Sequence, residues 1–254
     1  MDEITSVKNP FVRLLKSLSG RAARAEAGLI LVEGEIMIRE ALACGLAPRE
    51  AMGLREKSVF LETLPCRAHV VPEEVLRAAT DTKTPQGICA AFEAPSPVPP
   101  GELPRRVVAL DGVQDPGNVG TIWRTADAAG FQGILFGEGC ADALSPKVLR
   151  AAMGSGFRLP YAQTDDLAGA LFALREKGHS ILCSALNGTD FYARGETGER
   201  FTLVVGSEAH GISDAVRQTA THLVRLPMRG GAESLNAAVA AGIMMYELMR
   251  ARSG

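Results

Sequence analysis

The segment Asp111–Phe131 reads DGVQDPGNVGTIWRTADAAGF and lies between two apolar runs, Val107–Leu110 and Ile134–Phe136. Its Asp-Pro-Gly sequence at 115–117 predicts a turn, and the residues that follow are apolar at helical spacing. A strand, a helix and a second strand in this order predict one unit of a parallel sheet, because parallel strands need a long crossover between them. The apolar positions of the helix are Val119, Ile122, Trp123, Ala126 and Ala129.

Three more apolar runs follow at the spacing of strands, at Ile181–Leu186, Leu203–Val205 and Leu223–Leu226. Helix-capping residues, a helix-starting proline and closing glycines predict two further helices, at 145–154 and 165–178. Strands that alternate with helices predict an α/β fold with a mostly parallel sheet covered on both faces. In such sheets ligands bind beyond the carboxyl ends of the strands, so the loops there are the candidates for chemistry.

A proline-rich segment divides the chain. Glu93–Arg106, EAPSPVPPGELPRR, holds five of the fourteen prolines. Proline fixes φ and has no backbone N–H, so an extended, semi-rigid linker is expected between an N-terminal domain, 1–92, and a C-terminal domain, 107–254. Helical patterns alternate with short apolar runs in the N-terminal part, which predicts a small α/β domain. The expected helices span 36–44 and 73–79, and the expected strands span 29–32, 59–61, 68–71 and 87–92.

The composition excludes several classes of protein. Twenty-seven basic against 29 acidic residues give a net charge of −2, which is not that of a polybasic nucleic-acid coat. A mean hydropathy of +0.08 argues against a disordered chain. The five cysteines are scattered and form no C-x-x-C pair, which is typical of reduced thiols in a cytoplasmic protein without a metal site. The longest apolar stretch, 235–249, is too short to cross a membrane, and the first 25 residues show no signal-peptide pattern.

The first of three candidate loops is the one that opens the helix after 115–117. Gly117, Gly120 and Arg124 share one stripe of that helix. The two glycines leave a face without side chains for a bulky ligand, and the free amides of a helix N-terminus favour an anion. The alternative is that Arg124 is a solvated surface residue and the glycines only shape the turn.

The second loop is Phe201–Ser213, FTLVVGSEAHGIS. A buried strand is expected to end at Gly206, and Glu208 and Gly211 follow. Small residues at a strand end permit close approach of a ligand to the backbone. A structural carboxylate is the alternative for Glu208, and His210 has no companion at the spacing of metal ligands.

The third loop lies in Leu226–Arg250, LPMRGGAESLNAAVAAGIMMYELMR. A glycine-rich turn precedes Ser234 and Asn236, two polar residues at the start of the final helix. That helix is rich in alanine and apolar nearly all round, so it is either the centre of its own domain or part of a dimer interface.

Nucleotide-binding fingerprints are absent from the sequence. Two G-x-G sequences, at 137–139 and 154–156, lack the third glycine and the strand–helix setting of a dinucleotide site. A Rossmann oxidoreductase is therefore disfavoured. Another small-molecule α/β enzyme is supported by the fold pattern alone, and fold does not establish function.

Taken in order, the three loops resemble the signature motifs of the SpoU (TrmH-like) RNA ribose 2′-O-methyltransferases, a family of the SPOUT class. The motifs are DPGNVGTIWRTADAAGF, VGSEAHGIS and LPMRGGAESLNAAVA. The N-terminal sequences ITSVKNP, LVEG and DTKTPQG are similar to that family's L30e-like substrate-binding domain. The resemblance implies a C-terminal trefoil knot, although threaded chains are rare exceptions among folds.

The resemblance also implies S-adenosylmethionine as the cofactor, bound by backbone groups of the knot loops. The residues that correspond to its cofactor-binding positions are Gly206, Leu226, Leu235, Met228, Leu186 and Gly211.

Five residues are the candidate catalytic residues. Arg124 is associated with activation of the ribose hydroxyl, either as a base in a strongly perturbed site or as a cation that stabilises the developing alkoxide and grips the 3′ phosphate. We favour the cation, because a guanidinium has no acceptor. Asn118 and Asn236 are expected to orient groups by hydrogen bonds, Ser234 to contact the nucleotide, and Glu208 to hold Arg124 or the hydroxyl.

The family's activity implies an RNA partner, with ribosomal RNA favoured over transfer RNA because of the N-terminal domain. A non-catalytic RNA-binding relative is the alternative function. A homodimer through the knot and the C-terminal helix is expected, with no membrane partner and a cytoplasmic location. Phosphate contacts are expected from the basic N-terminal segment, at Lys8, Asn9, Arg13, Lys16, Arg21 and Arg24.

Overall fold

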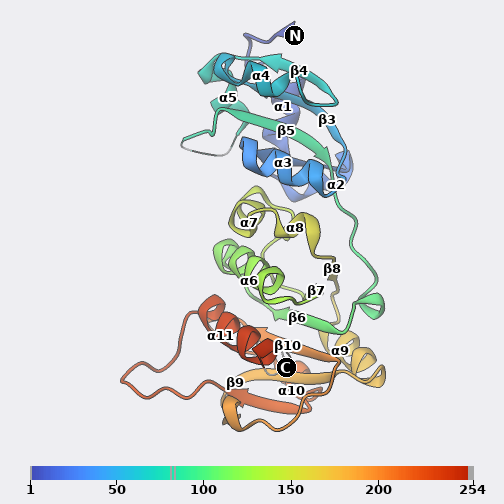
Figure 1. Cartoon of the computed structure of the whole chain (residues 1–254), viewed down its shortest axis with the longest axis vertical. Coiled ribbons are helices and arrows are strands. Elements are labelled where there is room, and N and C mark those ends of the chain that lie inside the picture. The colour runs from blue at the N-terminus through green and yellow to red at the C-terminus, as the bar shows by residue number, and fades with distance from the viewer. Residues whose placement is uncertain (1, 81, 83, 251–254) are drawn as a thin grey trace. The chain divides into compact units, whose positions relative to one another are not determined.

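The computed structural model describes residues 2–80, 82 and 84–250. The chain forms two compact units, drawn in Figure 1. Unit 1 contains 1–96 and 144–157, and unit 2 contains 97–143 and 158–254. Among the helices of the described residues, none has the length and apolar composition that a membrane crossing needs.

Unit 1 is built on a five-stranded mixed sheet with strand order β1-β4-β3-β5-β2. The strand β5 runs antiparallel to both of its neighbours, while β1, β3 and β4 are parallel. The strands are β1 (Asp2–Glu3), β2 (Leu29–Glu33), β3 (Pro48–Gly53), β4 (Arg67–Val70) and β5 (Ile88–Glu93).

Helices cover both faces of this sheet. Alternate residues of a strand point to opposite faces, so Leu31 packs with α1 (Pro10–Ser17) and α5 (Glu73–Ala79), while Ile30 packs with α3 (Glu35–Ala43). The remaining helices of this part are the short α2 (Arg21–Ala27), η1 (Arg55–Lys57) and α4 (Ser58–Leu61).

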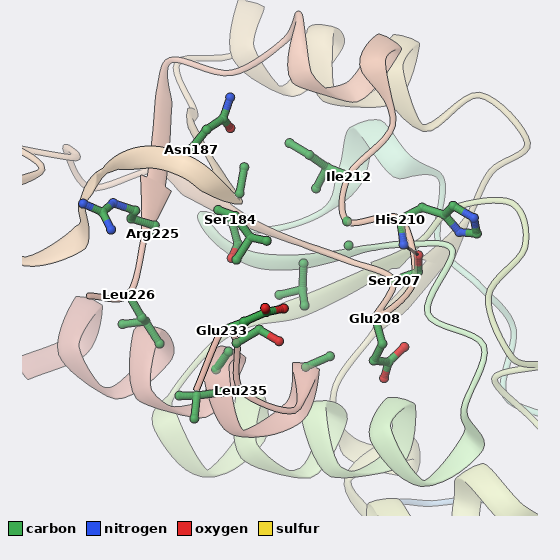
Figure 2. Close-up of a pocket in the computed structure, with 18 of the residues that line it drawn as sticks. Ser184, Asn187, Ser207, Glu208, His210, Ile212, Arg225, Leu226, Glu233 and Leu235 are labelled. Atoms are coloured by element: carbon green, nitrogen blue, oxygen red, sulfur yellow. Dashed lines mark hydrogen bonds between the residues drawn. The ribbon is translucent and has the colours of Figure 1, made fainter. Parts of the chain in front are cut away.

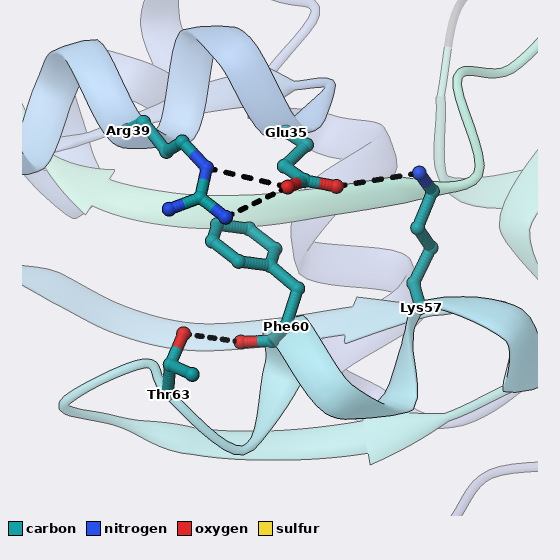
Figure 3. A network of polar contacts seen from close by, with 5 residues as sticks. All are labelled: Glu35, Arg39, Lys57, Phe60 and Thr63. Atoms are coloured by element: carbon teal, nitrogen blue, oxygen red, sulfur yellow. Dashed lines mark hydrogen bonds and ion pairs between the residues drawn. The ribbon is translucent and has the colours of Figure 1, made fainter.

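The expectation of a strand at 59–61 is wrong, because these residues form α4. Phe60 and Leu61 turn into the core, whereas Val59 is 78% exposed. Three apolar residues in a row do not distinguish a strand from one turn of helix. Arg39 of α3 covers the Phe60 side chain of α4 (Figure 3). Its guanidinium lies 4.4 Å from the centre of the Phe60 ring and donates to Glu35 at 2.8 Å.

The segment 144–157 carries α7 (Pro146–Ala152) and packs in unit 1, although it lies within the range expected for the C-terminal domain. Leu149 is buried in the cluster that contains Ile38 and Phe92. Arg150 donates to the buried carboxylate of Glu33 at 3.5 Å.

Unit 2 has a six-stranded sheet in the order β11-β9-β10-β6-β7-β8, and every neighbouring pair is parallel. This confirms the predicted parallel sheet. The strands are β6 (Arg106–Asp111), β7 (Gly133–Phe136), β8 (Tyr161–Gln163), β9 (Ser180–Asp190), β10 (Phe201–Gly206) and β11 (His222–Arg225).

The helices of unit 2 pack on the two faces of the sheet. One face holds α9 (Leu167–Glu176) and α10 (Asp214–Arg217), and α11 (Ala237–Arg250) packs against α6 (Pro116–Ala129) and β10. The final helix starts one residue after Asn236, whose side chain caps it by accepting from the amides of Ala238 and Val239. The expected caps are confirmed at the other helices, where Ser145 starts α7 and Asp166 starts α9.

The proline-rich segment is packed at its C-terminal end. Leu103 is 4% exposed and belongs to the core of unit 2. The amide of Val98 donates to the carbonyl oxygen of Tyr161 at 2.8 Å. The residues around η2 (Pro100–Glu102) are extended, with ψ near 140° at Pro99 and Leu103.

The centre of the sheet brings two of the candidate loops together. Gly206, the last residue of β10, is paired with Asp111, the last residue of β6. After β6 the chain adds β7 and β8 on one side of the sheet, whereas β10 lies on the other side of β6, next to β9. The gap between β6 and β10 is therefore a topological switch point, the place where α/β sheets bind ligands.

Candidate active site

Three side chains from distant parts of the sequence form a hydrogen-bonded chain beyond this switch point. The amide nitrogen of Asn236 donates to the amide oxygen of Asn118 at 2.9 Å. The amide nitrogen of Asn118 in turn donates to a carboxylate oxygen of Glu208. All three are predicted catalytic residues, so the three loops meet as expected at these positions.

Local structure fixes each member of this chain. Asn118 lies in the first turn of α6, where its backbone N–H donates to the capping carboxylate of Asp115 at 2.7 Å. Glu208 lies in the loop after β10, which closes through a pair of backbone hydrogen bonds between Ser207 and Gly211. Asn236 is held as the cap of α11.

A cavity of about 490 Å³ opens beside these residues (Figure 2). This volume is in the range of sites for small molecules and cofactors. Every predicted cofactor-binding residue lines it, together with Glu208 and Ser234. These cofactor positions are Leu186, Gly206, Gly211, Leu226, Met228 and Leu235.

Glycine is required at the floor of this cavity. A Cβ at Gly206 would collide with the backbone of Gly211, so a side chain there is incompatible with the closed loop. Gly211 has φ of +67°, a left-handed conformation that glycine adopts without strain. The result is a wall of backbone that a flat ligand can approach closely.

Arg124 does not join the chain of asparagines and glutamate. It lies on α6 six residues after Asn118, about 9 Å along the helix axis, and does not line the cavity. Its side chain is exposed and contacts no carboxylate among the described residues. Glu208 accepts from Asn118 in this structure, so the expectation that Glu208 holds Arg124 or the hydroxyl stays a prediction.

Seven polar residues of the cavity wall were not predicted as site residues: Ser184, Asn187, Ser207, His210, Arg217, Arg225 and Glu233. Asn187 follows an apolar run that resembled an uninterrupted strand, and the two arginines lie at the ends of α10 and β11. A position at the carboxyl end of a parallel strand is the one signal that could have identified Arg225. Glu233 is the residue directly before Ser234.

The residues predicted to bind RNA lie in and around α1 and α2. Lys8, Arg13, Lys16 and Arg21 are exposed. Asn9 caps α1 by accepting from the amide of Phe11 at 2.8 Å.

Arg24 is a correction to that set. It is 5% exposed, and its guanidinium donates to the carbonyl oxygens of Leu18 and Ser19 at 2.6 and 2.9 Å. These carbonyls lie just beyond the C-terminal end of α1, so Arg24 stabilises that helix end instead of facing a phosphate.

No group of histidine, cysteine and acidic side chains in the described ranges is arranged to hold a metal ion. His210 is exposed and donates its backbone N–H to Ser207 Oγ at 3.1 Å.

Known proteins that resemble this chain cover its whole length. Residues 105–246 match the SpoU rRNA Methylase family, and residues 9–90 match the MRM3-like substrate binding domain. The 23S rRNA (guanosine(2553)-2'-O)-methyltransferase RlmP of Bacillus subtilis (strain 168) is 36% identical over 250 residues, which are 98% of this chain and 99% of that protein.

Two solved structures are similar over nearly all of both chains. The AdoMet-bound rRNA methyltransferase from Sinorhizobium meliloti has a TM-score of 0.87 and 30% identity, and covers 100% of this chain and 99% of its own. The SpoU methyltransferase AviRb from Streptomyces viridochromogenes, in complex with AdoMet, has a TM-score of 0.86 and 28% identity over 97% of this chain and 100% of its own. On the family match and on the identity to RlmP, the chain belongs to the SpoU rRNA methylase family.

Proposed function

We propose that the protein transfers a methyl group from S-adenosylmethionine to the 2′-oxygen of a ribose in structured RNA, with ribosomal RNA as the favoured substrate. The observation that carries this proposal is the contact among Asn118, Glu208 and Asn236 at the edge of the cavity. The activity of the similar RlmP of Bacillus subtilis, a 23S rRNA 2'-O-methyltransferase, supports the reaction class.

The cavity suits S-adenosylmethionine in size and lining. Leu226, Leu235 and Met228 offer apolar surface to an adenine ring, and the backbone at Gly206 and Gly211 offers hydrogen-bonding groups at close range. When bound, the cofactor supplies an electrophilic methyl group. The protein's task is to hold the ribose hydroxyl in line with that group and to favour loss of its proton.

The polar chain at the cavity edge performs the orienting part of this task. Asn118 uses both ends of its amide, so Asn236 and Glu208 fix its orientation and leave the carboxylate of Glu208 at a defined position. A carboxylate has several lone-pair sites, so Glu208 can accept from Asn118 and from a ribose hydroxyl together. We assign Ser234 a hydrogen bond to the nucleotide.

Arg124 acts as a cation. A guanidinium only donates hydrogen bonds, so its role is to stabilise negative charge that develops on the 2′-oxygen and to bind the adjacent phosphate. Because Arg124 is exposed and does not line the cavity of its own chain, we assign it to the cavity of a second subunit.

A homodimer built on α11 and α6 would allow this. The outer face of α11 exposes Val239, Ile243 and Tyr246 to 52%, 38% and 55%. A groove lined by Ile243 and Tyr246 also contacts Ala128 of α6. An apolar stripe of this kind indicates a protein interface. Most homodimers are two-fold symmetric, so each subunit would present its Arg124 to the other. The C-terminal trefoil knot that the family resemblance implies is part of the same proposal.

Unit 1 binds the RNA. Some basic residues of unit 1 are paired with a carboxylate: Arg39 and Lys57 both bind Glu35 (Figure 3), and Arg39 above all lowers the pKa of that carboxyl. The exposed cations of α1 and α2 have no carboxylate partner among the described residues, which leaves them available for phosphate. These are Arg13, Lys16 and Arg21, with Lys8 just before α1 and Asn9 at its cap.

The test is incubation of the purified protein with methyl-labelled S-adenosylmethionine and total RNA from a strain that lacks the gene. Digestion and mass spectrometry should find the label on a ribose 2′-oxygen of ribosomal RNA. Label on a base would overturn the reaction, and label confined to transfer RNA would overturn the favoured substrate. Cofactor binding without transfer to any RNA would indicate the non-catalytic RNA-binding alternative. The cytoplasmic location stays a prediction.

A further inference from the structure

The strand β9 leaves the sheet of unit 2 in its middle. Its residues 180–183 pair with β10, and Leu182 and Cys183 also pair with β11; pairing with β11 resumes at Thr189. Cys183 faces Leu223 and Thr189 faces the next residue, Val224, so five residues of β9 have no partner on that strand. We call this segment, 184–188, the excursion. It is longer than the single extra residue of an ordinary β-bulge.

The excursion is part of the cavity wall. Four of its five residues line the cavity, and Leu186 at its tip is 75% exposed. The return to the sheet is tight: a Cβ at Gly188 would lie 2.6 Å from backbone atoms of Val224. Thr189 Oγ1 then donates to the carbonyl oxygen of Leu223 at 3.1 Å. The far end of the excursion is therefore fixed, while its tip lacks backbone pairing to β11.

Two arginines contact the excursion from neighbouring elements. Arg217, the last residue of α10, donates from Nη1 to Oδ1 of Asn187 at 2.9 Å. Arg225, the last residue of β11, donates from Nε to the carbonyl oxygen of Gly188 at 3.1 Å. Both also line the cavity, and Figure 2 shows Asn187 and Arg225 on the same side of it.

We propose that Arg217 and Arg225 are positioning residues that hold the excursion 184–188 in place as one wall of the cofactor cavity before the cofactor binds. A five-residue segment without a pairing strand loses conformational freedom when a ligand orders it. Hydrogen bonds from two separate elements remove that freedom in advance, and such preorganisation increases affinity. This inference rests on the proposed function, because it takes S-adenosylmethionine as the occupant.

A different role for these arginines gives a different result. A guanidinium in the cavity could instead bind the carboxylate of the methionine part of the cofactor. In that case the loss of Arg217 would weaken a ligand that carries the carboxylate and leave 5′-methylthioadenosine, which lacks the amino-acid part, unaffected. If Arg217 acts by holding Asn187, its loss should instead weaken the binding of both ligands equally.

The experiment is a double-mutant cycle measured by isothermal titration calorimetry on the full-length protein. Arg217→Ala and Asn187→Ala should each raise the Kd of S-adenosylmethionine and of 5′-methylthioadenosine about five- to tenfold. The double variant should be no weaker than either single variant, because both remove the same hydrogen bond. Arg225→Ala should also weaken both ligands, while Arg175→Ala, an exposed arginine of α9, should change neither Kd.

Further measurements separate positioning from general stability. Backbone amides of 184–188 should exchange hydrogen faster in Arg217→Ala at an unchanged Tm, and Arg217→Lys, which can still reach Asn187, should recover most of the affinity. Weakening of S-adenosylmethionine alone, additive effects in the cycle, or unchanged Kd values would each overturn the inference. Failure of the wild-type protein to bind S-adenosylmethionine would refute the proposed function itself.

Discussion

Asn236 and Asn118 are 118 positions apart in the sequence, yet the side-chain amide of the first donates to that of the second at 2.9 Å. The same Asn236 side chain caps α11 with its oxygen. One residue thus joins the start of the last helix to the start of α6. The amide nitrogen and the amide oxygen of Asn236 have different roles, which can be tested separately.

Asn236→Asp keeps the capping oxygen and removes the donor to Asn118. We expect kcat to fall on the order of 100-fold, because Asn118 and Glu208 lose their fixed orientation. The Tm should stay within about 2 °C of the wild type, whereas Asn236→Ala also loses the cap, at a cost of about 1 kcal/mol. Wild-type turnover in Asn236→Asp would show that the hydrogen bond is not used in the reaction.

Arg124→Lys keeps the charge and removes the planar, forked donor set. We expect more than a tenfold loss of turnover with the Kd of S-adenosylmethionine within a factor of two, since Arg124 is assigned to the 2′-oxygen and the adjacent phosphate of the RNA and not to the cofactor. Methyl transfer to RNA and calorimetry measure the two quantities. Arg175→Lys is the control, and retention of more than a tenth of the activity by Arg124→Lys would show that its role is misassigned.

Gly206→Ala places a Cβ against the backbone of Gly211 and must open the loop that follows β10. We expect at least a tenfold weaker affinity for S-adenosylmethionine. The matched control is Gly231→Ala, in the loop before Ser234, where a Cβ meets nothing within 4 Å. Equal affinities for the two variants would contradict the close packing of the Gly206 loop.

Ile243→Glu combined with Tyr246→Glu places two charges on the exposed apolar stripe of α11. Burial of unpaired charges opposes association, so the protein should elute with the mass of one chain in light-scattering chromatography. Activity should be lost as well, because Arg124 then has no second cavity to serve. Phe172→Glu, on the exposed side of α9, controls for added charge. A fully active single chain would refute the assignment of Arg124 to a second subunit.

Stability should decline in mild acid because of His179. Burial, with contributions from Arg200 and Lys177, lowers the pKa of His179 to about 4 from its ordinary 6.5. In the unfolded chain, His179 is therefore protonated below about pH 6.5, whereas in the folded protein it stays neutral down to about pH 4. The free energy of unfolding should fall by about 2 kcal/mol between pH 7 and pH 5 from this group.

Urea denaturation at the two pH values measures this effect. His179→Gln removes the titrating group and should lose correspondingly less stability on acidification. His222→Gln, on β11, should behave like the wild type. Parallel losses in the wild type and in His179→Gln would contradict the role of His179.

Local patterns predicted much of unit 2. Helical spacing from Val119 to Ala129 and the turn before it identified α6, and its cap at Asp115 is confirmed. The same reasoning could not identify β3, where Arg49 and Glu50 interrupt the apolar pattern, because that strand is held by its neighbours β4 and β5. The excursion of β9 was also missed. Whether Leu186 continues a paired strand depends on β11, which follows in the sequence about 40 residues later, and the local sequence does not show this.

The site divides in the same way. The loop residues Asn118, Glu208 and Asn236 were identified by their resemblance to family motifs, and no spacing rule would have placed them in contact. For Arg24 the sequence pattern suggested a role that its contacts in the fold exclude. Its charge and position suggested phosphate binding, but the sequence does not reveal that its guanidinium folds back onto the carbonyl groups at the end of α1.

The membership of α7 in unit 1 bears on how such enzymes can be recombined. A chimera that exchanges the residues up to the proline-rich segment for those of a relative would leave Leu149 without the side chains that bury it and Arg150 without Glu33. A transplanted module must bring its own counterpart of 144–157. Evolution by simple end-to-end fusion would have faced the same requirement, so this insertion and its host module are expected to change together.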